Sequence, residues 1–340
     1  MGSGRVCHDF VQAMKIVEGA KVVAVCSRSL LKANEFANLH RIPRAYGSYE
    51  ELARDPEIDV IYVGSLHTFH LYHASLALKH GKHCLCEKPL ACNVNDARFL
   101  LGLARRNDLF IMEGMWTRFF PAVQMAKNYL EGGRLGNVVA VHSDFGFHYS
   151  DCYDYPQSDI FRPEMAGGAL LNHGVYPLSM APFAFRSQGS TKISATGIVD
   201  DFTKVDMCGS VNIQYGSAGI AVLTYNLMAE TDEETSIIGT TGRLRLNSPG
   251  HCPTSITIIQ KGSVRGQTIT EIFEFPLPQE TPEIIKSGGF NYPNSIGFSY
   301  EAQAVVDCIN AGRLECLDYP HKDMLQVMGM CAEIQKQIKI

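Results

Sequence analysis

The sequence has few charged residues and no long apolar run, and these two absences argue against certain classes of partner. Only 19% of its 340 residues are charged, and the net charge of -5 argues against a nucleic-acid partner, which would need a basic surface. No apolar run approaches the roughly 18–20 residues of a membrane span. The first residues also lack the basic-then-apolar pattern of a secretory signal. We therefore expect a cytoplasmic protein without a membrane or nucleic-acid partner.

Cysteine, in contrast, is abundant, with 11 residues. A disulfide framework is the first interpretation to consider, but the number is odd and the chain is large. Several cysteines, such as Cys26, Cys84 and Cys208, lie in apolar runs typical of strands. Buried, reduced thiols of a cytosolic protein explain this pattern better.

Strand-like and helix-like segments alternate through the first 115 residues. Strands that alternate with helices of 10–15 residues predict βαβ units, and continuous apolar runs suit a parallel sheet covered on both faces. In chain order the segments are 21–26, 29–40, 59–63, 69–80, 83–86, 94–106 and 109–112. The pattern predicts an α/β fold with a Rossmann-type dinucleotide-binding domain over residues 1–115.

Beyond about residue 190 strand-like runs follow one another without helices between them. Such runs predict a separate sheet-rich domain, which we assign to residues 116–340. Two helices, at about 295–311 and 321–338, close the chain. The last of them could belong to the second domain or return to the first.

A glycine-rich stretch opens the chain. Gly2 and Gly4 match the G-x-G-x-x-small pattern and precede an apolar helical pattern, as in loops that bind a pyrophosphate at a helix N-terminus. A flexible N-terminal tail is the alternative. Only Met1 precedes the loop, so the strand that normally leads into it, which is central in the sheet, is missing from this sequence. We expect its neighbours to carry unpaired ladder groups, at about 1–3 kcal/mol for each buried one, unless a longer form supplies the strand.

The end of the second expected strand indicates the cofactor. An NAD site usually has a carboxylate there for the ribose hydroxyls, whereas a 2′-phosphate requires Arg and small donors. The sequence has Ser27 and Arg28 and no carboxylate. The pattern favours NADP, although Arg28 could also be a solvated residue at the start of a helix.

The stretch Cys86-Glu-Lys-Pro-Leu90 resembles the Gfo/Idh/MocA oxidoreductase family. Four further stretches, at 44–52, 115–121, 167–171 and 298–302, are similar to a dimeric branch that oxidises trans-dihydrodiols or D-xylose at C1 with NADP. The resemblance implies a Rossmann domain followed by an α+β domain with a large, mostly antiparallel sheet. In the family the open face of that sheet commonly forms a homodimer. The second domain would then bind the sugar or cyclic diol substrate.

Two residues carry the expected chemistry, which is hydride transfer to nicotinamide and removal of the hydroxyl proton. Lys88 lies at the end of a strand, where open α/β sheets place ligands, and Tyr176 matches the proposed acid/base of the family. A free phenol, with a pKa near 10, is a poor base at neutral pH, so Lys88 must help Tyr176. A solvated lysine and a core tyrosine are the alternatives.

Position 172 departs from the family pattern. Asn172 stands where Asp is expected, and an amide cannot accept a proton as a base. Residues 172 and 176 are expected on one face of a helix. His173 should point about 100° away from residue 172, so it would replace the carboxylate poorly.

The resemblance implies roles for further residues. Ser65, His67, His70 and Glu87 would lie beside the cofactor. Trp116, Arg118 and Phe145 would line the substrate site with His173, although Trp116 could belong to the core and Arg118 could anchor a loop. The segment 145–162 could form a lid.

A metal site and full activity are both open to doubt. The H-x-x-H-x-x-H spacing from His67 drifts around a helix and no carboxylate or cysteine completes it, so we expect no metal. Asn172 and the missing strand also allow a second hypothesis, in which the chain is a catalytically impaired relative that binds nucleotide or acts as a dimeric structural partner.

Overall fold

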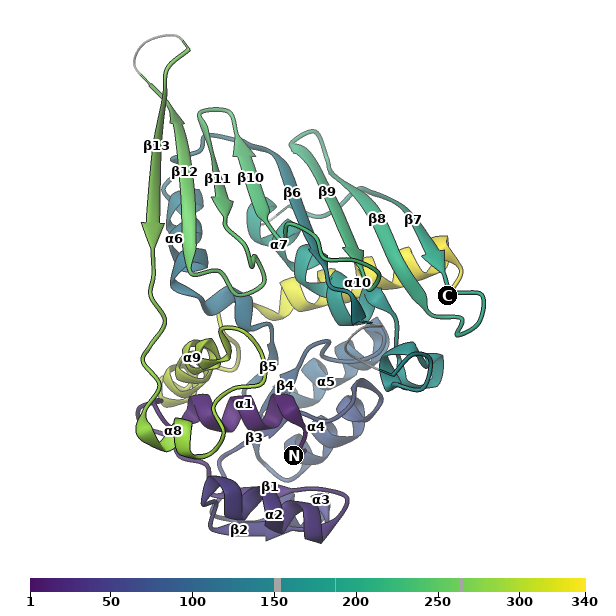
Figure 1. Ribbon diagram of the computed structural model, residues 1–340, viewed down its shortest axis with the longest axis vertical. Helices are drawn as coiled ribbons and strands as arrows, with labels where there is room; N and C mark the ends of the chain where they lie inside the picture. The colour runs from purple at the N-terminus through teal and green to yellow at the C-terminus, as the bar shows by residue number, and fades with distance from the viewer. Residues whose placement is uncertain (150–153, 187, 263–265) are drawn as a thin grey trace. The chain divides into compact units, whose positions relative to one another are not determined.

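The computed structural model describes residues 1–149, 154–186, 188–262 and 266–340. Contacts between residues divide the chain into two units. Unit 1 comprises Met1–Phe119 and Leu277–His321, and unit 2 comprises Phe120–Pro276 and Lys322–Ile340 (Figure 1). The expected boundary near residue 115 assigned all later residues to the second domain. The structure differs, because Leu277–His321 packs with the N-terminal segment.

Unit 1 contains five parallel strands in two sheets. β1 (Ala24–Cys26) pairs with β2 (Arg44–Tyr46), and β3 (Val60–Val63), β4 (His83–Glu87) and β5 (Ile111–Gly114) form a second sheet in that order. The helices that alternate with them are α2 (Leu30–His40), α3 (Tyr49–Arg54), η1 (His67–Phe69), α4 (His70–Lys79), α5 (Val94–Arg106) and η2 (Trp116–Phe119). The predicted Rossmann-type parallel sheet is confirmed.

The two sheets are linked by the first two residues. The Met1 amine donates to Tyr62 O at 2.6 Å, Gly64 N donates to Met1 O at 2.9 Å, and Gly2 N donates to Cys26 O at 2.9 Å. Met1 and Gly2 bond to the edges of β1 and β3 that β2 and β4 do not occupy. Among the described residues, no strand pairs with either of these two edges. β1 and β3 therefore belong to separate sheets in the described part of the chain, and Met1 and Gly2 link them.

Helix α1 (Arg5–Met14) explains why the segment 277–321 belongs to unit 1. Its Asp9 and Gln12 are fully buried and need polar partners. Asp9 accepts from the backbone N–H groups of Asn291 and Tyr292, and Gln12 Nε2 donates to the carbonyls of Ile284 and Gly289. The segment itself folds as α8 (Pro282–Lys286), η7 (Ser295–Gly297) and α9 (Phe298–Asn310).

Unit 2 is built on one large sheet. Among the described residues, eight strands form it in the order β13-β12-β11-β10-β6-β9-β8-β7, and all neighbours are antiparallel except β6 and β9. This confirms the predicted large, mostly antiparallel sheet. The strands are β6 (Val138–Gly146), β7 (Lys192–Val199), β8 (Asp206–Tyr215), β9 (Gly219–Asn226), β10 (Thr235–Gly239), β11 (Gly242–Leu246), β12 (Ser255–Lys261) and β13 (Thr268–Glu274).

Helices cover one face of this sheet. α6 (Pro121–Glu131) and α7 (Val175–Phe185) pack on it, and α10 (His321–Ile338) ends against the edge strand β7, where Gln337 Nε2 donates to Ile193 O (Figure 1). The described part of unit 2 also contains the short helices η4 (Asp159–Phe161) and η5 (Pro163–Met165) and the π-turn η6 (Leu170–Gly174). Among the described residues, no helix has the length and apolar character of a membrane span.

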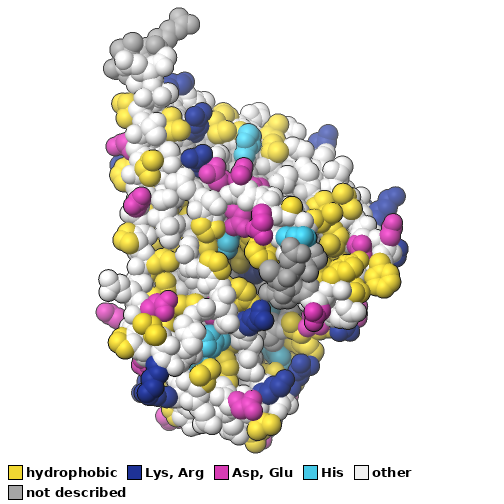
Figure 2. Space-filling view, viewed as in Figure 1, with side chains coloured by type: hydrophobic (Ala, Val, Ile, Leu, Met, Phe, Trp, Pro, Cys, Tyr) yellow, Lys and Arg dark blue, Asp and Glu magenta, His cyan; other side chains and the backbone are white. Residues whose placement is uncertain are grey.

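In the part of the chain that the structure describes, the other face of the sheet carries exposed side chains. Side chains of β9 alternate between buried and exposed, so that Ile220 and Val222 are exposed while Ala221 and Leu223 are buried. Figure 2 shows scattered hydrophobic side chains among polar and charged ones on this side of the strands.

Candidate active site

The glycine loop at the start of α1 has room for an anion. Gly2 has a φ of 115°, and a Cβ there would lie 2.6 Å from Gly64 O, so no other residue fits without a shift. Gly4 is the N-cap of α1, and nothing lies within 4 Å of the place where its Cβ would be. Its side chain cannot cap the helix, and the first N–H groups of α1 can therefore bind a phosphate.

The end of β1 lies beside this loop. Ser27 is buried, and the Ser3 hydroxyl donates to the Ser27 hydroxyl at 3.1 Å. Arg28 follows and is exposed. The Ser27 hydroxyl therefore lies beside the loop, and Arg28 is the next residue in the chain.

His70 connects the ends of two strands in unit 1. Its Nδ1 lies 2.7 Å from Pro89 O and its Nε2 lies 2.9 Å from Ser65 O. Burial lowers the pKa of His70, so its neutral ring donates to one of these carbonyls at a time. The ring of His67 lies 5.8 Å from that of His70. His70 thus fixes the loop that carries Lys88, whose peptide bond to Pro89 is cis.

His73, the third histidine of this run, also has a polar partner. His73 Nδ1 lies 2.9 Å from the Ser65 hydroxyl. In the part of the chain that the structure describes, no group of three or more His, Cys, Asp or Glu side chains could hold a metal ion.

Lys88 lies among buried acids. Glu87 accepts from the Tyr62 hydroxyl at 2.7 Å, and Glu113 accepts from Leu90 N at 3.1 Å and from the Tyr319 hydroxyl at 3.3 Å. Burial lowers the pKa of Lys88 to about 8, although both carboxylates oppose this shift. Burial likewise raises the pKa of Glu113 to about 7. The amine can therefore exchange a proton near neutral pH.

Sequence reasoning missed Glu113. A signal was available, because this carboxylate ends an apolar run in the strand after β4, and the carboxyl ends of neighbouring parallel strands meet at one edge of a sheet.

Trp116 and Arg118 are held inside unit 1. Trp116 is buried and stacks on Phe298 with ring centroids 4.4 Å apart. Arg118 is buried too; its Nη1 donates to Asp318 O at 3.3 Å and its guanidinium lies 4.9 Å from the centre of the Tyr319 ring. These contacts explain why both residues are ordered, and their contact with substrate stays a prediction.

In unit 2, a π-turn carries Asn172 and His173, where the sequence predicts an ordinary helix. Buried Asp206 holds its start, since its carboxylate accepts from Leu170 N at 2.7 Å. Gly168 precedes it with a φ of 100°, and a Cβ there would lie 2.1 Å from Asp206 Oδ1. Asn172 Nδ2 donates to Gly168 O at 2.7 Å. π-turns within helices are frequent at functional sites.

Phe145, from β6, gathers the aromatic residues of this site. Its ring stacks on His173 at 4.3 Å and meets Tyr176 edge-on at 5.2 Å. His173 Nδ1 also lies 2.9 Å from Asn226 O. His173 and Tyr176 therefore contact the same ring, and the structure brings three of the predicted residues together in unit 2.

His251 completes this cluster and was not predicted. Its ring also stacks on Phe145, with ring centroids 4.4 Å apart, and its Nδ1 lies 3.0 Å from Glu233 Oε2. His251 comes from the connection between β11 and β12, and no motif in the sequence marks it. Residues 150–153 of the predicted lid lie outside the described residues.

A phosphate loop on a parallel sheet, a lysine between carboxylates and a second unit with a large sheet define a class, the nucleotide-dependent oxidoreductases. Comparison with family models agrees. Residues 1–115 match the "Oxidoreductase family, NAD-binding Rossmann fold" and residues 123–245 match the "GFO/IDH/MocA C-terminal domain". The chain belongs to the Gfo/Idh/MocA oxidoreductase family, as the sequence motifs indicated, and it is an enzyme of the dehydrogenase type.

Curated relatives and solved structures support the same placement. The chain is 37% identical over 340 residues to trans-1,2-dihydrobenzene-1,2-diol dehydrogenase of Danio rerio, covering 99% of this chain and 95% of the relative. It is 34% identical to the Homo sapiens enzyme of that name, covering 99% and 95%. A levoglucosan dehydrogenase in complex with NADH and levoglucosan has the same fold, with a TM-score of 0.85 at 18% identity over 99% of this chain and 95% of that one.

Proposed function

We propose that this enzyme oxidises a hydroxyl-bearing carbon of a trans-dihydrodiol, or C1 of D-xylose, with NADP as the hydride acceptor. The observation that carries the proposal is the half-buried Lys88 beside the buried carboxyl groups of Glu87 and Glu113, where desolvation lowers the pKa of its amine to about 8. The names of the curated relatives support the dihydrodiol as substrate. D-xylose rests on the sequence motifs.

Lys88 and Tyr176 handle the hydroxyl proton in this proposal. The bound nicotinamide supplies the hydride acceptor when the cofactor is present. Tyr176 takes the proton of the substrate hydroxyl as its own phenolic proton passes to the neutral Lys88 amine, so the charge is balanced when the carbonyl forms. The proposal requires that the phenol and the amine act on the same hydroxyl group.

The remaining roles are those that the resemblance to the family implies. Gly2, Gly4, Ser27 and Arg28 would hold the phosphates of NADP, and Ser65, His67, His70 and Glu87 would shape the nicotinamide end of the site. Phe145, His173, Trp116 and Arg118 would contact the substrate, for which the flat ring of Phe145 suits a sugar or cyclic diol. The open face of the sheet would form a homodimer. Every cysteine among the described residues is free, which fits the cytoplasm.

The test compares substrates, cofactors and variants by the formation of reduced nicotinamide. We expect oxidation of trans-1,2-dihydrobenzene-1,2-diol or D-xylose with NADP to exceed that with NAD. Lys88→Ala and Tyr176→Phe should each lower kcat by about a hundredfold or more. Lys79→Ala, which removes an exposed lysine from the end of α4, should leave kcat unchanged. Retention of wild-type kcat in either active-site variant would refute the assignment of roles.

A second candidate function is a catalytically impaired relative that binds nucleotide without turnover. Asn172 favours it, since its amide donates to Gly168 O and supplies no carboxylate. Tight NADPH binding measured by calorimetry, with no turnover of any sugar or diol, would support this candidate. A gain of activity in Asn172→Asp would then identify the amide as the cause.

A further inference from the structure

Glu113 is a fully buried carboxyl group to which the proposed reaction gives no role. It lies near the end of β5, beside the end of β4 where Glu87 precedes Lys88. The parallel ladder pairs Glu113 with Cys86 and Gly114 with Glu87, so the two carboxyl groups come from neighbouring strand ends. A buried carboxylate requires hydrogen-bond donors or a nearby positive charge. The partners of Glu113 therefore indicate its role.

Each oxygen of Glu113 accepts a hydrogen bond from a different segment. Oε1 accepts from Leu90 N at 3.1 Å, and Oε2 accepts from the Tyr319 hydroxyl at 3.3 Å. Leu90 follows Lys88 by two residues, in the turn that leaves β4. The side chain of Glu113 therefore ties the turn that carries Lys88 to β5.

The segment of Tyr319 is itself held against β5. Ile111 N donates to Leu314 O at 3.4 Å, and His321 Nε2 lies 2.9 Å from Ile111 O. Tyr319 is fully buried, and the guanidinium of Arg118 lies 4.9 Å from the centre of its ring. These contacts fix the position of the hydroxyl that donates to Glu113.

The charge of Glu113 acts on Lys88. Burial favours the neutral amine, whereas the carboxylates of Glu87 and Glu113 favour the ammonium. Burial raises the pKa of Glu113 to about 7 and lowers the pKa of Lys88 to about 8. As the pH rises, Glu113 therefore ionises before Lys88 loses its proton, and it is a carboxylate when the amine becomes neutral.

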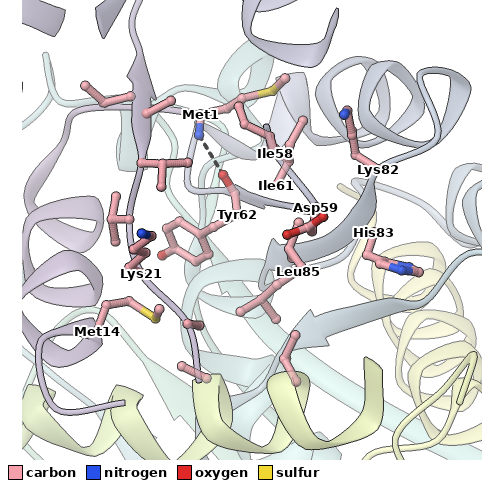
Figure 3. Close-up of a pocket in the computed structure, with 18 of the residues that line it drawn as sticks. Met1, Met14, Lys21, Ile58, Asp59, Ile61, Tyr62, Lys82, His83 and Leu85 are labelled. Carbon is pink, nitrogen blue, oxygen red and sulfur yellow. Dashed lines mark hydrogen bonds between the residues drawn. The ribbon is translucent and has the colours of Figure 1, made fainter. Parts of the chain in front are cut away.

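Other titratable groups surround the two strand ends. Figure 3 shows Tyr62 on β3, and its hydroxyl donates to Glu87 Oε1 at 2.7 Å. Arg118 beside Tyr319 has a permanent positive charge. Burial raises the pKa of Tyr62, Cys86, Glu87 and Glu301 and lowers that of His70. A substitution of Glu113 alone leaves all these groups in place, so it isolates the effect of the Glu113 charge.

We propose that Glu113 is a positioning residue for the oxidation, which holds the turn of Lys88 through Leu90 N and, as a carboxylate, balances the charge of the Lys88 ammonium. The inference rests on the proposed function, in which the Lys88 amine receives the substrate proton. The negative charge of Glu113 stabilises the ammonium formed in that step, so the amine is a stronger base than burial alone would allow. Loss of the charge should weaken the base, and loss of the hydrogen bond should displace it.

Two substitutions separate the charge of Glu113 from its hydrogen bonds. Glu113→Gln keeps an oxygen that can accept from Leu90 N and gains an amide that can donate to the Tyr319 oxygen, so the turn stays in place while the charge is lost. Glu113→Ala removes the charge and both hydrogen bonds. Glu35→Gln on exposed α2 is the matched control. Melting temperatures show whether each variant folds.

The first measurement does not depend on turnover. Lys88 is half-buried, so a small reagent such as acetic anhydride can reach its amine. The rate of acetylation, followed by mass spectrometry of the peptide that contains Lys88, reports the fraction of neutral amine at each pH. Its midpoint should move to lower pH by about half a unit or more in Glu113→Gln and should not move in Glu35→Gln. An unchanged midpoint in Glu113→Gln would overturn the proposal, whatever the activity of the enzyme.

The second measurement is kcat/KM for the oxidation across the pH range. Its rising limb should move in Glu113→Gln by the same amount as the acetylation midpoint, and the plateau should fall by about threefold or more because the base is weaker. Glu113→Ala should lower kcat by about tenfold or more. A limb that stays in place while the acetylation midpoint moves would show that the Lys88 amine is not the base. That result would overturn the proposed function and, with it, the role of Glu113 in the reaction.

A further variant keeps the test available if Glu113→Gln does not fold. Tyr319→Phe removes the donor to Oε2, which favours the protonated form of Glu113 and so reduces its charge. The acetylation midpoint of Lys88 should again move to lower pH. A midpoint that stays in place in a folded Tyr319→Phe variant would count against the proposal in the same way.

Discussion

Lys88 is a base whose strength is set by its surroundings. Burial disfavours its charged form, while Glu87 and Glu113 favour it, and the balance leaves its pKa at about 8. The pKa of a lysine in water is higher. At a pH of about 8 such a lysine would be almost fully protonated and could not accept a proton.

The first prediction concerns the pH dependence of oxidation. Because only the neutral amine accepts the proton, kcat/KM should rise with pH and level off above about 8. Lys88→Arg keeps a positive charge at every accessible pH and should lose this limb together with most of the activity. Steady-state kinetics across the pH range provide the measurement, and an unchanged profile in Lys88→Arg would contradict the role of Lys88 as the base.

Glu301 is another buried carboxyl group, and its burial bears on the stability of the folded state. It is fully buried on α9, and neither of its oxygens has a hydrogen-bond partner among the described residues. Burial, with the nearby Glu87, raises the pKa of Glu301 well above its usual value. The folded state therefore holds a proton that the unfolded state releases above a pH of about 4.5.

The second prediction follows from the direction of this pKa shift. The contribution of Glu301 to stability is complete below its unfolded pKa and is lost as the pH rises toward its folded pKa. The melting temperature should fall between about pH 5 and pH 8, and Glu301→Gln, neutral and of the same shape, should reduce this fall. Glu35→Gln on exposed α2 is the matched control. An equal fall in wild type and Glu301→Gln would show that Glu301 is charged when folded.

At the scale of elements, the π-turn η6 depends on a close approach. Gly168 lies against the Asp206 carboxylate that holds Leu170 N, and its positive φ is strained for any other residue. Through this π-turn, His173 and Tyr176 contact the ring of Phe145.

The third prediction tests this support. Gly168→Ala should lower the melting temperature and also lower kcat, because the added methyl displaces Asp206 and with it the turn that carries Tyr176. Gly189→Ala, in open surroundings in the same unit, should change neither. Thermal denaturation and kinetics distinguish the two variants, and wild-type kcat in Gly168→Ala would separate the turn from catalysis.

The elements show which features can be predicted from sequence. Helix α10 matches its expected range, because its amphipathic pattern is local. The π-turn was expected as an ordinary helix, since its geometry depends on Asp206, which is distant in the chain. His251 was missed for the same reason: only the fold brings the β11–β12 connection to Phe145. The segment 277–321 joins unit 1 through the buried Asp9 and Gln12, whose partners no local pattern identifies.

At the scale of the whole molecule, the open face of the unit 2 sheet supports the proposed dimer. Ile220 and Val222, in the first half of β9, are 48% and 37% exposed, and β9 has neighbouring strands on both sides. Dimerisation would remove this apolar surface from water.

The fourth prediction is that Val222→Arg converts a dimer into a monomer, because two buried guanidinium groups near a symmetry axis repel each other. Sedimentation and light scattering measure the mass. Leu31→Arg, on exposed α2, should leave the dimer intact. A monomeric wild-type chain, or a dimeric Val222→Arg, would place the interface elsewhere or exclude it.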